Sequence, residues 1–411
     1  MPNSGISVPG FRIFFYISKQ QMNLSFWKKD GINKSGKGIK GQKAEYMAMR
    51  MSDIAKLAGV SKSTVSRAFS RPEMLQKETL DRIMAIARIH DYRPNTMAQA
   101  IARHRFNLVG FLLLHKSRPF FDHSFYGPAL DGFMERAKAR GYHVVLGATT
   151  RRNDYFEEGV INDCIDGALL TSRDPDPFIK VFQSRNIPIV LIQNETGLEN
   201  VGMVTDNNYS GMMKIMEHLI SERGYQNIAF CSSRLSHPCD MQRYFAYIDA
   251  VEKHGLKPYS DPDLPEYDLE DSFPPNPVIL SRYGRKEIPR FGTPIIIPSS
   301  TPPETSEKVL LKLLPFRKMP DAIVCTTDSI AIGVCRALQK KGFRIPQDTA
   351  VTGYDDIGTA SLCIPSLTTV HVDPYRLGAE SMDLLCRYIN DPGCPSTRIC
   401  IDNELVIRES S

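Results

Sequence analysis

Residues 51–69 constrain this chain most, because they are typical of two short helices joined by a glycine turn. The first helix carries apolar residues at helical spacing, namely Ile54, Ala55, Leu57 and Ala58. Gly59 breaks this helix in a turn that needs a permissive backbone, Val60 fills the space between the helices, and Ser61 caps the second helix. We therefore expect a compact helical module, completed by a third helix over residues 77–90.

The second helix is small, polar and cationic on its outer face. We expect Lys62, Ser63, Ser66 and Arg67 to point outward, and Val65 and Ala68 to point inward. A short helix, a glycine turn and a polar cationic helix together place side chains at base edges in the major groove. Arg67 can reach G O6 and N7, while Ser63 and Thr64 can bond phosphates or base edges. On spacing alone, a plain three-helix bundle with a solvated face remains an alternative.

A short helical stretch follows the module at residues 96–106. Tyr92, Pro94 and Asn95 end the bundle, and Ile101 is the apolar residue that projects from the stretch. A lone helix of roughly three turns is not stable in water. It would order against a twin from a second subunit and the DNA minor groove, where an apolar side chain can wedge a base step open. The alternative is a flexible linker.

Residues 51–106 resemble the headpiece and hinge of the LacI/GalR family of bacterial repressors, through DIAKLAGVSKSTVSRAFS and YRPNTMAQAIA. The resemblance implies that Lys62 and Ser63 choose the operator and that Arg67 occupies the position of the family's arginine. Ile101 takes the place of the hinge wedge, which is usually leucine; isoleucine is similar in volume but stiffer, so the depth of wedging stays open. The predicted DNA-binding residues are Ser52, Lys62, Ser63, Thr64, Ser66, Arg67, Asn95, Ile101 and Arg103.

Charge is distributed unevenly along the chain. Residues 1–50 carry a net charge of +7, residues 51–107 carry +5, and residues 108–411 carry −7. This asymmetry suits an N-terminal module that meets a polyanion while an acidic body stays away from it. We expect residues 1–50 to form a disordered basic extension. Either it adds nonspecific phosphate contacts or, in the favoured interpretation, translation begins at Met47, Met49 or Met51.

From residue 108 onward, apolar runs typical of buried strands alternate with helical segments. The strands are expected at 108–114, 142–149, 166–172, 187–193, 227–233, 321–327 and 348–356, and helices at 128–140 and 211–223. Repeated strand and helix predict parallel doubly wound sheets, and about 300 residues exceed one such sheet, so two lobes are expected. The predicted fold is an all-α helix-turn-helix headpiece (51–94), a hinge helix (95–107) and an α/β body (108–411).

The body resembles the same family over essentially its whole length. The strongest match lies within residues 326–378, in TTDSIAIGVCRALQKKGFRIPQDTAVTGYDD and IPSLTTVHVDPYRLG. The resemblance implies two interleaved lobes of the periplasmic-binding-protein type, the first at 108–193 with 367–389, the second at 194–366 with the final strand. A ligand would lie in the cleft between them, where strand ends converge.

The resemblance also implies effector-binding positions. Arg243, in QRYFAYIDAVEKHG, and Asp328, in TTDSIAIG, take the places of a family arginine and a hydroxyl-binding aspartate. Arginine can fork onto a carboxylate, a phosphate or paired hydroxyls, and aspartate accepts from hydroxyls or amines. The aromatic pair of the first loop is either Phe120 with Phe121 or Phe125 with Tyr126. The second pair keeps the spacing to Gly132 and is favoured. Proline-rich residues 256–309 have no counterpart that aligns, so one wall of the pocket stays undefined.

Other classes of protein find little support in the sequence. It contains no GxSxG, P-loop or HExxH motif and no GxGxxG after the first strand, so neither an enzyme nor a cofactor is expected. The nine cysteines lack paired short spacing, which argues against a zinc cluster or a disulfide framework. The apolar run at 13–17 is far short of the roughly 20 residues of a membrane span, and no signal peptide precedes the module.

We therefore predict a cytoplasmic, sequence-specific DNA-binding transcriptional repressor that works as a homodimer or tetramer. Its partners would be operator DNA and a small polar effector such as a sugar, sugar acid or nucleoside. The rival prediction is a sugar-binding protein without a DNA role, and the headpiece distinguishes the two, since an exported binding protein would carry a signal peptide there. The operator, the effector and the direction of the effector's action are not specified by the sequence.

Overall fold

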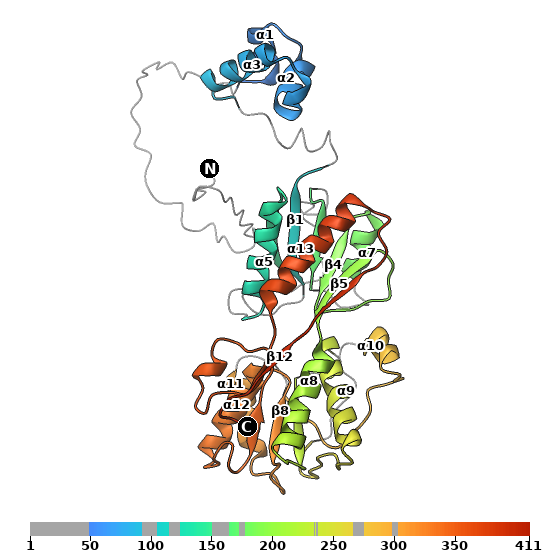
Figure 1. Ribbon diagram of the computed structural model, residues 1–411, viewed down its shortest axis with the longest axis vertical. Helices are drawn as coiled ribbons and strands as arrows, with labels where there is room; N and C mark the ends of the chain where they lie inside the picture. Colours follow the sequence, from blue (N-terminus) through green and yellow to red (C-terminus); the bar gives the residue numbers. More distant parts are fainter. Residues whose placement is uncertain are drawn as a thin grey trace, which may run out of the picture. The chain divides into compact units, whose positions relative to one another are not determined.

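The computed structural model describes residues 49–92, 105–114, 124–149, 164–171, 177–233, 235, 237–265, 275–297 and 303–411. These residues belong to two compact units, a headpiece that ends at Phe106 and a body that begins at Asn107, and each is described by itself (Figure 1). Nearly all of the predicted extension (1–50) and of the predicted hinge (95–107) lies outside the described residues.

The described headpiece contains helices α1 (Met51–Ala58), α2 (Lys62–Ser70) and α3 (Lys77–Ile89), with a 3-10 turn at Pro72–Met74. Gly59 ends α1 at φ 64°, the left-handed conformation that a glycine turn requires. The buried core consists of Ile54, Ala55, Ala58, Val65, Ala68 and Ile83, and Val60 packs against it. The three predicted helices are therefore present at the expected places.

Leu57 is an exception to the expected apolar stripe of α1, because 54% of it is exposed. At 100° per residue, positions 54, 55 and 58 span an arc of about 100°, and position 57 lies about 60° outside it. The face of α1 that meets α2 and α3 is narrower than the sequence pattern indicated.

The first lobe of the body contains a six-stranded sheet in the order β11-β5-β4-β3-β1-β2, and every pair in it is parallel. Its strands are β1 (Leu108–Leu114), β2 (His143–Thr149), β3 (Gly167–Leu170), β4 (Ile189–Ile192), β5 (Val201–Asp206) and β11 (Arg398–Ile401). Helices α5 (Tyr126–Ala139) and α13 (Pro374–Asn390) cover one face, and α7 (Pro177–Ser184) covers the other. Alternate residues of β1 serve the two faces: Phe111 packs with α5, and Leu112 with α7.

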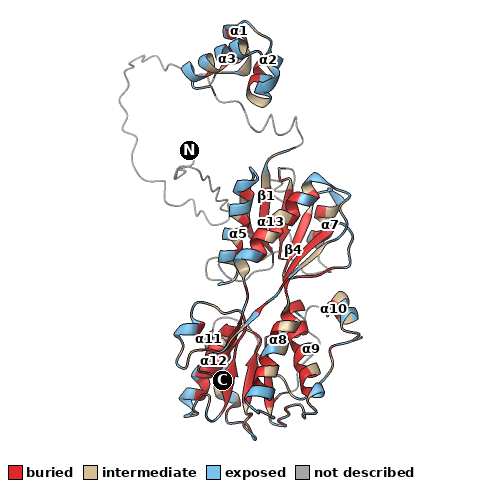
Figure 2. Ribbon diagram, in the orientation of Figure 1, coloured by how far each residue is buried: buried red, intermediate tan, exposed pale blue. Residues whose placement is uncertain are grey.

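The second lobe contains a four-stranded parallel sheet in the order β7-β6-β8-β9. The strands are β6 (Ile228–Ser232), β7 (Ile295–Ile296), β8 (Ala322–Cys325) and β9 (Ala350–Thr352). Helices α8 (Asn208–Glu217), which continues as a π turn over His218–Glu222, and α9 (Pro238–Lys253) pack on one face. Helices α11 (Pro303–Leu313) and α12 (Asp328–Lys340) pack on the other, and α10 (Pro277–Arg282) lies beside α9. Figure 2 shows the strands of this sheet as buried and the helices beside them as partly buried.

The two parallel lobes confirm the predicted fold class, but the predicted end of the first lobe at residue 193 was wrong. Strand β5 (Val201–Asp206) pairs with β4, so the first lobe extends to Asp206 instead of ending at residue 193. Strand β11 joins the first sheet, after which the chain returns to the second lobe. There β12 (Glu404–Val406) pairs antiparallel with β10 (Thr369–His371), and Val351 of β9 donates its N–H to the carbonyl of Ser410 at 2.9 Å. The chain thus passes between the lobes after β5, after β10 and between β11 and β12 (Figure 1).

Candidate functional site

The first turn of α2 is exposed and polar. Ser61 caps the helix as predicted, because its Oγ accepts the backbone N–H of Thr64 at 3.1 Å. The same oxygen lies 2.7 Å from Ser63 Oγ and 2.8 Å from Thr64 Oγ1. Lys62 and Ser63 are exposed. A cationic side chain beside free helix N-terminal amides presents two features that attract phosphate.

The remaining predicted DNA-binding residues lie in different surroundings. Arg67 is exposed one turn beyond Ser63, while Thr64 and Ser66 are partly buried. Ser52, at the start of α1, is also partly buried, and its Oγ lies 3.5 Å from an oxygen of Asp53. The predicted outward direction of Lys62, Ser63 and Arg67 is confirmed, whereas contact with DNA stays a prediction. Asn95, Ile101 and Arg103 lie outside the described residues.

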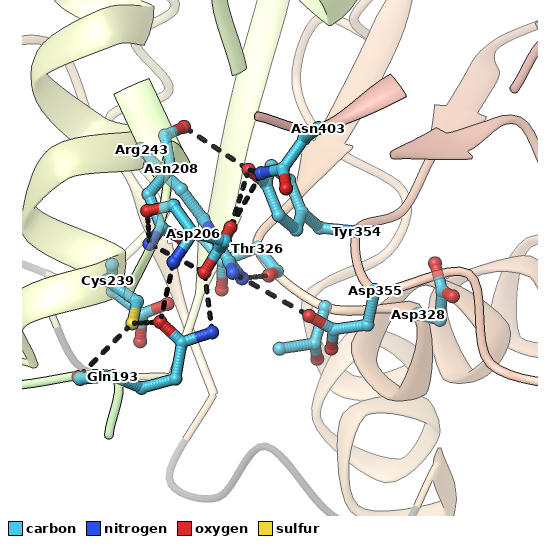
Figure 3. A network of polar contacts seen from close by, with 12 residues as sticks. Gln193, Asp206, Asn208, Cys239, Arg243, Thr326, Asp328, Tyr354, Asp355 and Asn403 are labelled. Carbon is cyan, nitrogen blue, oxygen red and sulfur yellow. Dashed lines mark hydrogen bonds and ion pairs between the residues drawn. The ribbon is translucent and has the colours of Figure 1, made fainter. Parts of the chain in front are cut away.

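Arg243 lies in the second turn of α9 and is buried, with only 4% of the residue exposed. Its Nε donates to Asn208 Oδ1 at 2.7 Å, and its Nη1 donates to the carbonyl of Thr326. Its Nη2 lies 3.6 Å from Asp355 Oδ1, and its guanidinium carbon lies 3.5 Å from the centre of the Tyr354 ring (Figure 3). Polar and aromatic groups from several elements therefore surround one buried cation.

The charge of Arg243 is secured by its neighbours. Burial opposes the charged form, but Asp355, Tyr354 and Asp206 outweigh it and raise the pKa of the guanidinium further. The side chain is therefore a permanent cation held at the junction of the two lobes.

Asp206, the last residue of β5, is fully buried and gathers donors from several segments (Figure 3). Its Oδ1 accepts from Gln193 Nε2 at 2.5 Å and from Asn208 Nδ2 at 3.0 Å. Its Oδ2 accepts from Asn403 Nδ2 at 2.6 Å and from the Tyr354 hydroxyl at 3.3 Å. Since these four donors are neutral, the carboxylate is satisfied without drawing on a hydrogen bond from Arg243.

Asp355 and Asp356 follow β9 with left-handed backbones, at φ 111° and 53°. The N–H of Asp355 donates to the carbonyl of Val370 at 3.0 Å. The carboxylate of Asp356 lies 3.0 Å from His371 Nδ1 and accepts from Arg408 Nη2 at 2.7 Å. Non-glycine residues persist in such conformations where surrounding contacts hold them, often at functional sites. This turn therefore fixes where the Asp355 carboxylate meets Arg243.

Asp328, the first residue of α12, is fully buried, and both of its carboxylate oxygens are occupied. Oδ1 accepts from the Thr369 hydroxyl at 2.6 Å, and Oδ2 accepts from the N–H of Ile357 at 2.8 Å. Burial raises the pKa of Asp328 to about 7. Figure 3 shows it apart from the groups around Arg243, whose carboxylate partner is Asp355. The predicted contact of Asp328 with an effector stays a prediction.

Phe125 and Tyr126 lie at the start of α5, where their rings meet edge to face with centroids 5.1 Å apart. Both are partly buried against the core that α5 shares with the first sheet. Their predicted approach to an effector stays a prediction. Phe120 and Phe121, the alternative pair, lie outside the described residues.

Sequence reasoning missed most of the polar network. Its additional members are Gln193, Asp206, Asn208, Tyr354, Asp355 and Asn403. Tyr354 and Asp355 lie in the GYDD segment, which belongs to the strongest match to the family, so the resemblance could have indicated them. Asn403 offered no signal, because a lone asparagine near an edge strand has no distinguishing neighbours in sequence.

The described part of the chain contains neither a group of metal-binding side chains nor a disulfide bond. No group of His, Cys, Asp and Glu side chains there has the arrangement of a metal site. The nine cysteines are free thiols, and Cys231, Cys239, Cys325, Cys335 and Cys386 are buried. Among the described helices, none combines the length and apolarity needed to cross a membrane.

Three family models match successive parts of the chain. Bacterial regulatory proteins of the lacI family match residues 50–95, and the periplasmic binding proteins and sugar binding domain of the LacI family match 107–271. A periplasmic binding protein-like domain matches 292–411, so residues 272–291 fall between two models. The chain belongs to the LacI family and is a DNA-binding transcriptional regulator with a helix-turn-helix headpiece and a periplasmic-binding-protein-like body.

Curated relatives of similar length are repressors. The probable HTH-type transcriptional repressor ExuR of Bacillus subtilis is 25% identical over 361 residues, which cover 87% of this chain and 97% of that protein. The HTH-type transcriptional repressor PurR of Actinobacillus pleuropneumoniae is 25% identical over 341 residues, or 82% and 90% of the two chains. These relatives support a regulator over a sugar-binding protein without a DNA role.

Solved structures share the fold. The complex of the transcriptional regulator CelR with cellobiose superposes with a TM-score of 0.60 at 22% identity, covering 88% of this chain and 100% of that one. The Lac repressor dimer bound to operator and the anti-inducer ONPF gives a TM-score of 0.65 at 22% identity, covering 88% and 98%.

Proposed function

We propose that the protein is a repressor whose affinity for its operator is controlled by a small polar effector held at Arg243 and Asp355. The observation that carries this proposal is the buried Arg243 on α9 of the second lobe. Its guanidinium contacts Asp355, in the turn after β9, and Asn208, where the chain enters the second lobe after β5. A ligand that engages this arginine contacts the segments through which the lobes are connected. Effector binding and lobe arrangement are thereby linked.

The geometry at Arg243 suits a hydroxyl-rich ligand. The separation of 3.6 Å between Arg243 Nη2 and Asp355 Oδ1 is longer than a hydrogen bond, so both groups keep capacity for a further partner. A hydroxyl between them can accept from the guanidinium and donate to the carboxylate. The side chain of Asp355 is 27% exposed, so a ligand can reach it. Sugars, sugar acids and nucleosides are the classes that carry such hydroxyls.

Lys62 and Ser63 are proposed to read the operator, with Arg67 on the same face. Ile101 is proposed to wedge a base step in the minor groove, and the remaining predicted residues are polar and are proposed to contact phosphates. Exposure of the first turn of α2 supports this role. The sequence resemblance supports a homodimer or tetramer, which would present two or more headpieces to a symmetric operator. A protein that acts on operator DNA in a bacterium works in the cytoplasm.

Asp355→Asn tests the effector site. The effector is first found by a thermal-shift screen of sugars, sugar acids and nucleosides, since a ligand at about 100 times its Kd adds about 2.7 kcal/mol of stability. We expect calorimetry to show at least about tenfold weaker binding to the variant, because a charge-assisted hydrogen bond is lost. Operator binding without effector should be retained.

Asp249→Asn is the matched control, because Asp249 pairs with Arg285 within the second lobe, away from Arg243. It should leave effector affinity unchanged. Undiminished affinity in Asp355→Asn would remove Asp355 from the site, and failure of the parent chain to select any operator would refute the repressor function.

A further inference from the structure

Glu195 is a fully buried charge outside the network around Arg243. It follows β4 in the first lobe, and the N–H of the next residue, Thr196, lies 3.4 Å from Met203 Sδ on β5. Arg398, on β11 of the same lobe, places its Nε 3.2 Å from Glu195 Oε1. Carboxylates are rarely buried this completely unless they are paired, so the partners of Glu195 define its role.

The other arginine that binds Glu195 comes from the second lobe. Arg282 is the last residue of α10, and its Nη2 lies 2.5 Å from Glu195 Oε2 while its Nη1 donates to Oε1 at 2.7 Å. Asn276, which caps α10, donates its Nδ2 to the backbone carbonyl of Glu195 at 2.8 Å. Two-pronged arginine–carboxylate pairs are among the stronger ionic contacts, and exclusion of water strengthens them further.

Helix α10 is anchored to the second lobe by the residues that follow it. The ring of Tyr283 stacks on Tyr209 of α8, with centroids 4.9 Å apart, and meets Phe245 of α9 edge on at 5.7 Å. Arg285 pairs with Asp249 of α9 at 2.5 Å. Arg282 therefore reaches from a fixed platform on one lobe to a buried carboxylate on the other.

We propose that Asn276, Arg282 and Glu195 form an interlobe clamp, which holds the two lobes together at this edge without an effector. Asn276 and Arg282, the second-lobe half of the clamp, lie in the proline-rich segment and in the interval 272–291 between the two matching family models. It biases the body toward the arrangement in which Glu195 is sealed from water. An effector at Arg243 then acts on a body whose lobes are already tethered, and the clamp sets part of the free energy that the effector must supply or overcome.

A disulfide-trapping experiment tests the clamp in the full chain with neither DNA nor effector present. A Cβ at Gly197 in the first lobe would lie 3.6 Å from Val278 Cγ2 on α10. The double variant Gly197→Cys, Val278→Cys therefore places two thiols near the separation that a disulfide needs. The rate of cross-link formation, followed by peptide mass spectrometry, measures how much of the time the lobes are apposed here.

Arg282→Gln in this background should slow cross-linking about tenfold, the change expected if the pair contributes about 1.4 kcal/mol to apposition. Arg282→Lys, which keeps a positive charge, should restore part of the rate. Arg336→Gln is the matched control, because it breaks an arginine ion pair, with Glu304 at 3.1 Å, that lies within the second lobe between α12 and α11. It should leave the rate close to that of the parent.

Equal rates with and without Arg282→Gln would overturn the clamp, and so would equal slowing by Arg336→Gln, because loss of any arginine ion pair in the second lobe would then be responsible. If Arg282→Gln fails to fold by circular dichroism, Glu195→Gln takes its place with the same expected slowing. The experiment uses no ligand and no operator, so its failure would leave the proposed repressor function standing.

Discussion

Two carboxylates in the body differ in how their charge is balanced, and this difference indicates which one can meet a ligand. Asp206 is fully buried and accepts hydrogen bonds from four neutral groups. Asp355 is partly exposed, and its charged neighbour Arg243 lies 3.6 Å away. A saturated carboxylate has little capacity left for a ligand, whereas Asp355 retains both access and acceptor sites. Asp206 is therefore a structural residue, which binds the segments where the chain passes from one lobe to the other.

Lys62→Ala should change which operator the protein prefers. Lys62 is exposed in the first turn of α2, so its loss should remove the proposed base-edge contact without disturbing the core, at a cost of about 1–3 kcal/mol on the sequence it is proposed to read. Binding-site selection on the variant and the parent measures the preference. Lys77→Ala, at the exposed start of α3, should return the parent operator. If the Lys62 variant also returned the parent operator, the base-reading role would be wrong.

Asp328 should make the protein less stable as the pH rises. Burial raises its pKa from 3.8 to about 7, so between these values the folded chain holds a proton that the unfolded chain has lost. The contribution of Asp328 to the free energy of unfolding is then greatest at the acidic end of this window and declines up to about pH 7. Asp328→Asn stays neutral, and should gain on the order of 1 kcal/mol over the wild type between about pH 5 and pH 8. Parallel slopes in urea denaturation of the two chains would contradict this.

The place of Arg243 in a polar site was within reach of sequence reasoning, but which acidic side chain lies beside it was not. Asp328, Asp355 and Asp356 all lie in the segment that matches the family most strongly, and the carboxylate of each is chemically suited to bind a hydroxyl. The left-handed turn after β9 directs Asp355 toward Arg243, and contacts from residues far along the chain occupy both oxygens of Asp328. Such choices depend on backbone angles and distant partners, which composition and spacing do not encode.

At the scale of elements, α5 and α13 approach each other closely through glycine. A Cβ on Gly378 of α13 would lie 1.8 Å from the carbonyl oxygen of Ala129 on α5. Gly378→Ala should therefore force the helices apart and lower the free energy of unfolding by about 1–3 kcal/mol. Gly127→Ala, on α5 with nothing within 4 Å of the new Cβ, should be neutral or stabilising. Chemical denaturation measures both, and equal effects would show that the close approach does not limit stability.

The alternation of strands and helices could be predicted because buried parallel strands are continuous apolar runs. Strand β11, with sequence RICI, escaped prediction because it is short, partly exposed and begins with a charge. Strand β9 was predicted too long, over 348–356, because the left-handed turn at Asp355 ends the extended backbone after Thr352. Strand pairing decides which lobe a segment joins, and a strand's own sequence carries little information about its partner.

At the scale of the whole molecule, the prediction concerns residues 96–106, which lie mostly outside the described residues. Their sequence is too short to form a stable lone helix, so we expect helical order only when the proposed dimer is bound to its operator. Hydrogen exchange of these residues should slow on operator DNA and not on nonspecific DNA. Effector binding should change operator affinity by roughly 5- to 150-fold, the usual range of allosteric coupling. Equal protection on both DNAs would refute this form of coupling.

The interleaving of the lobes determines when each lobe can fold during synthesis on the ribosome. The first sheet needs α13 on its face and β11 beside β5, yet both are synthesised after all four strands of the second sheet. At about 5–20 residues per second, β1 to β5 wait on the order of ten seconds or more with an open edge and an uncovered apolar face. The nascent first lobe therefore exposes the kind of apolar surface that chaperones bind, and it cannot complete its sheet until the end of the chain has been synthesised.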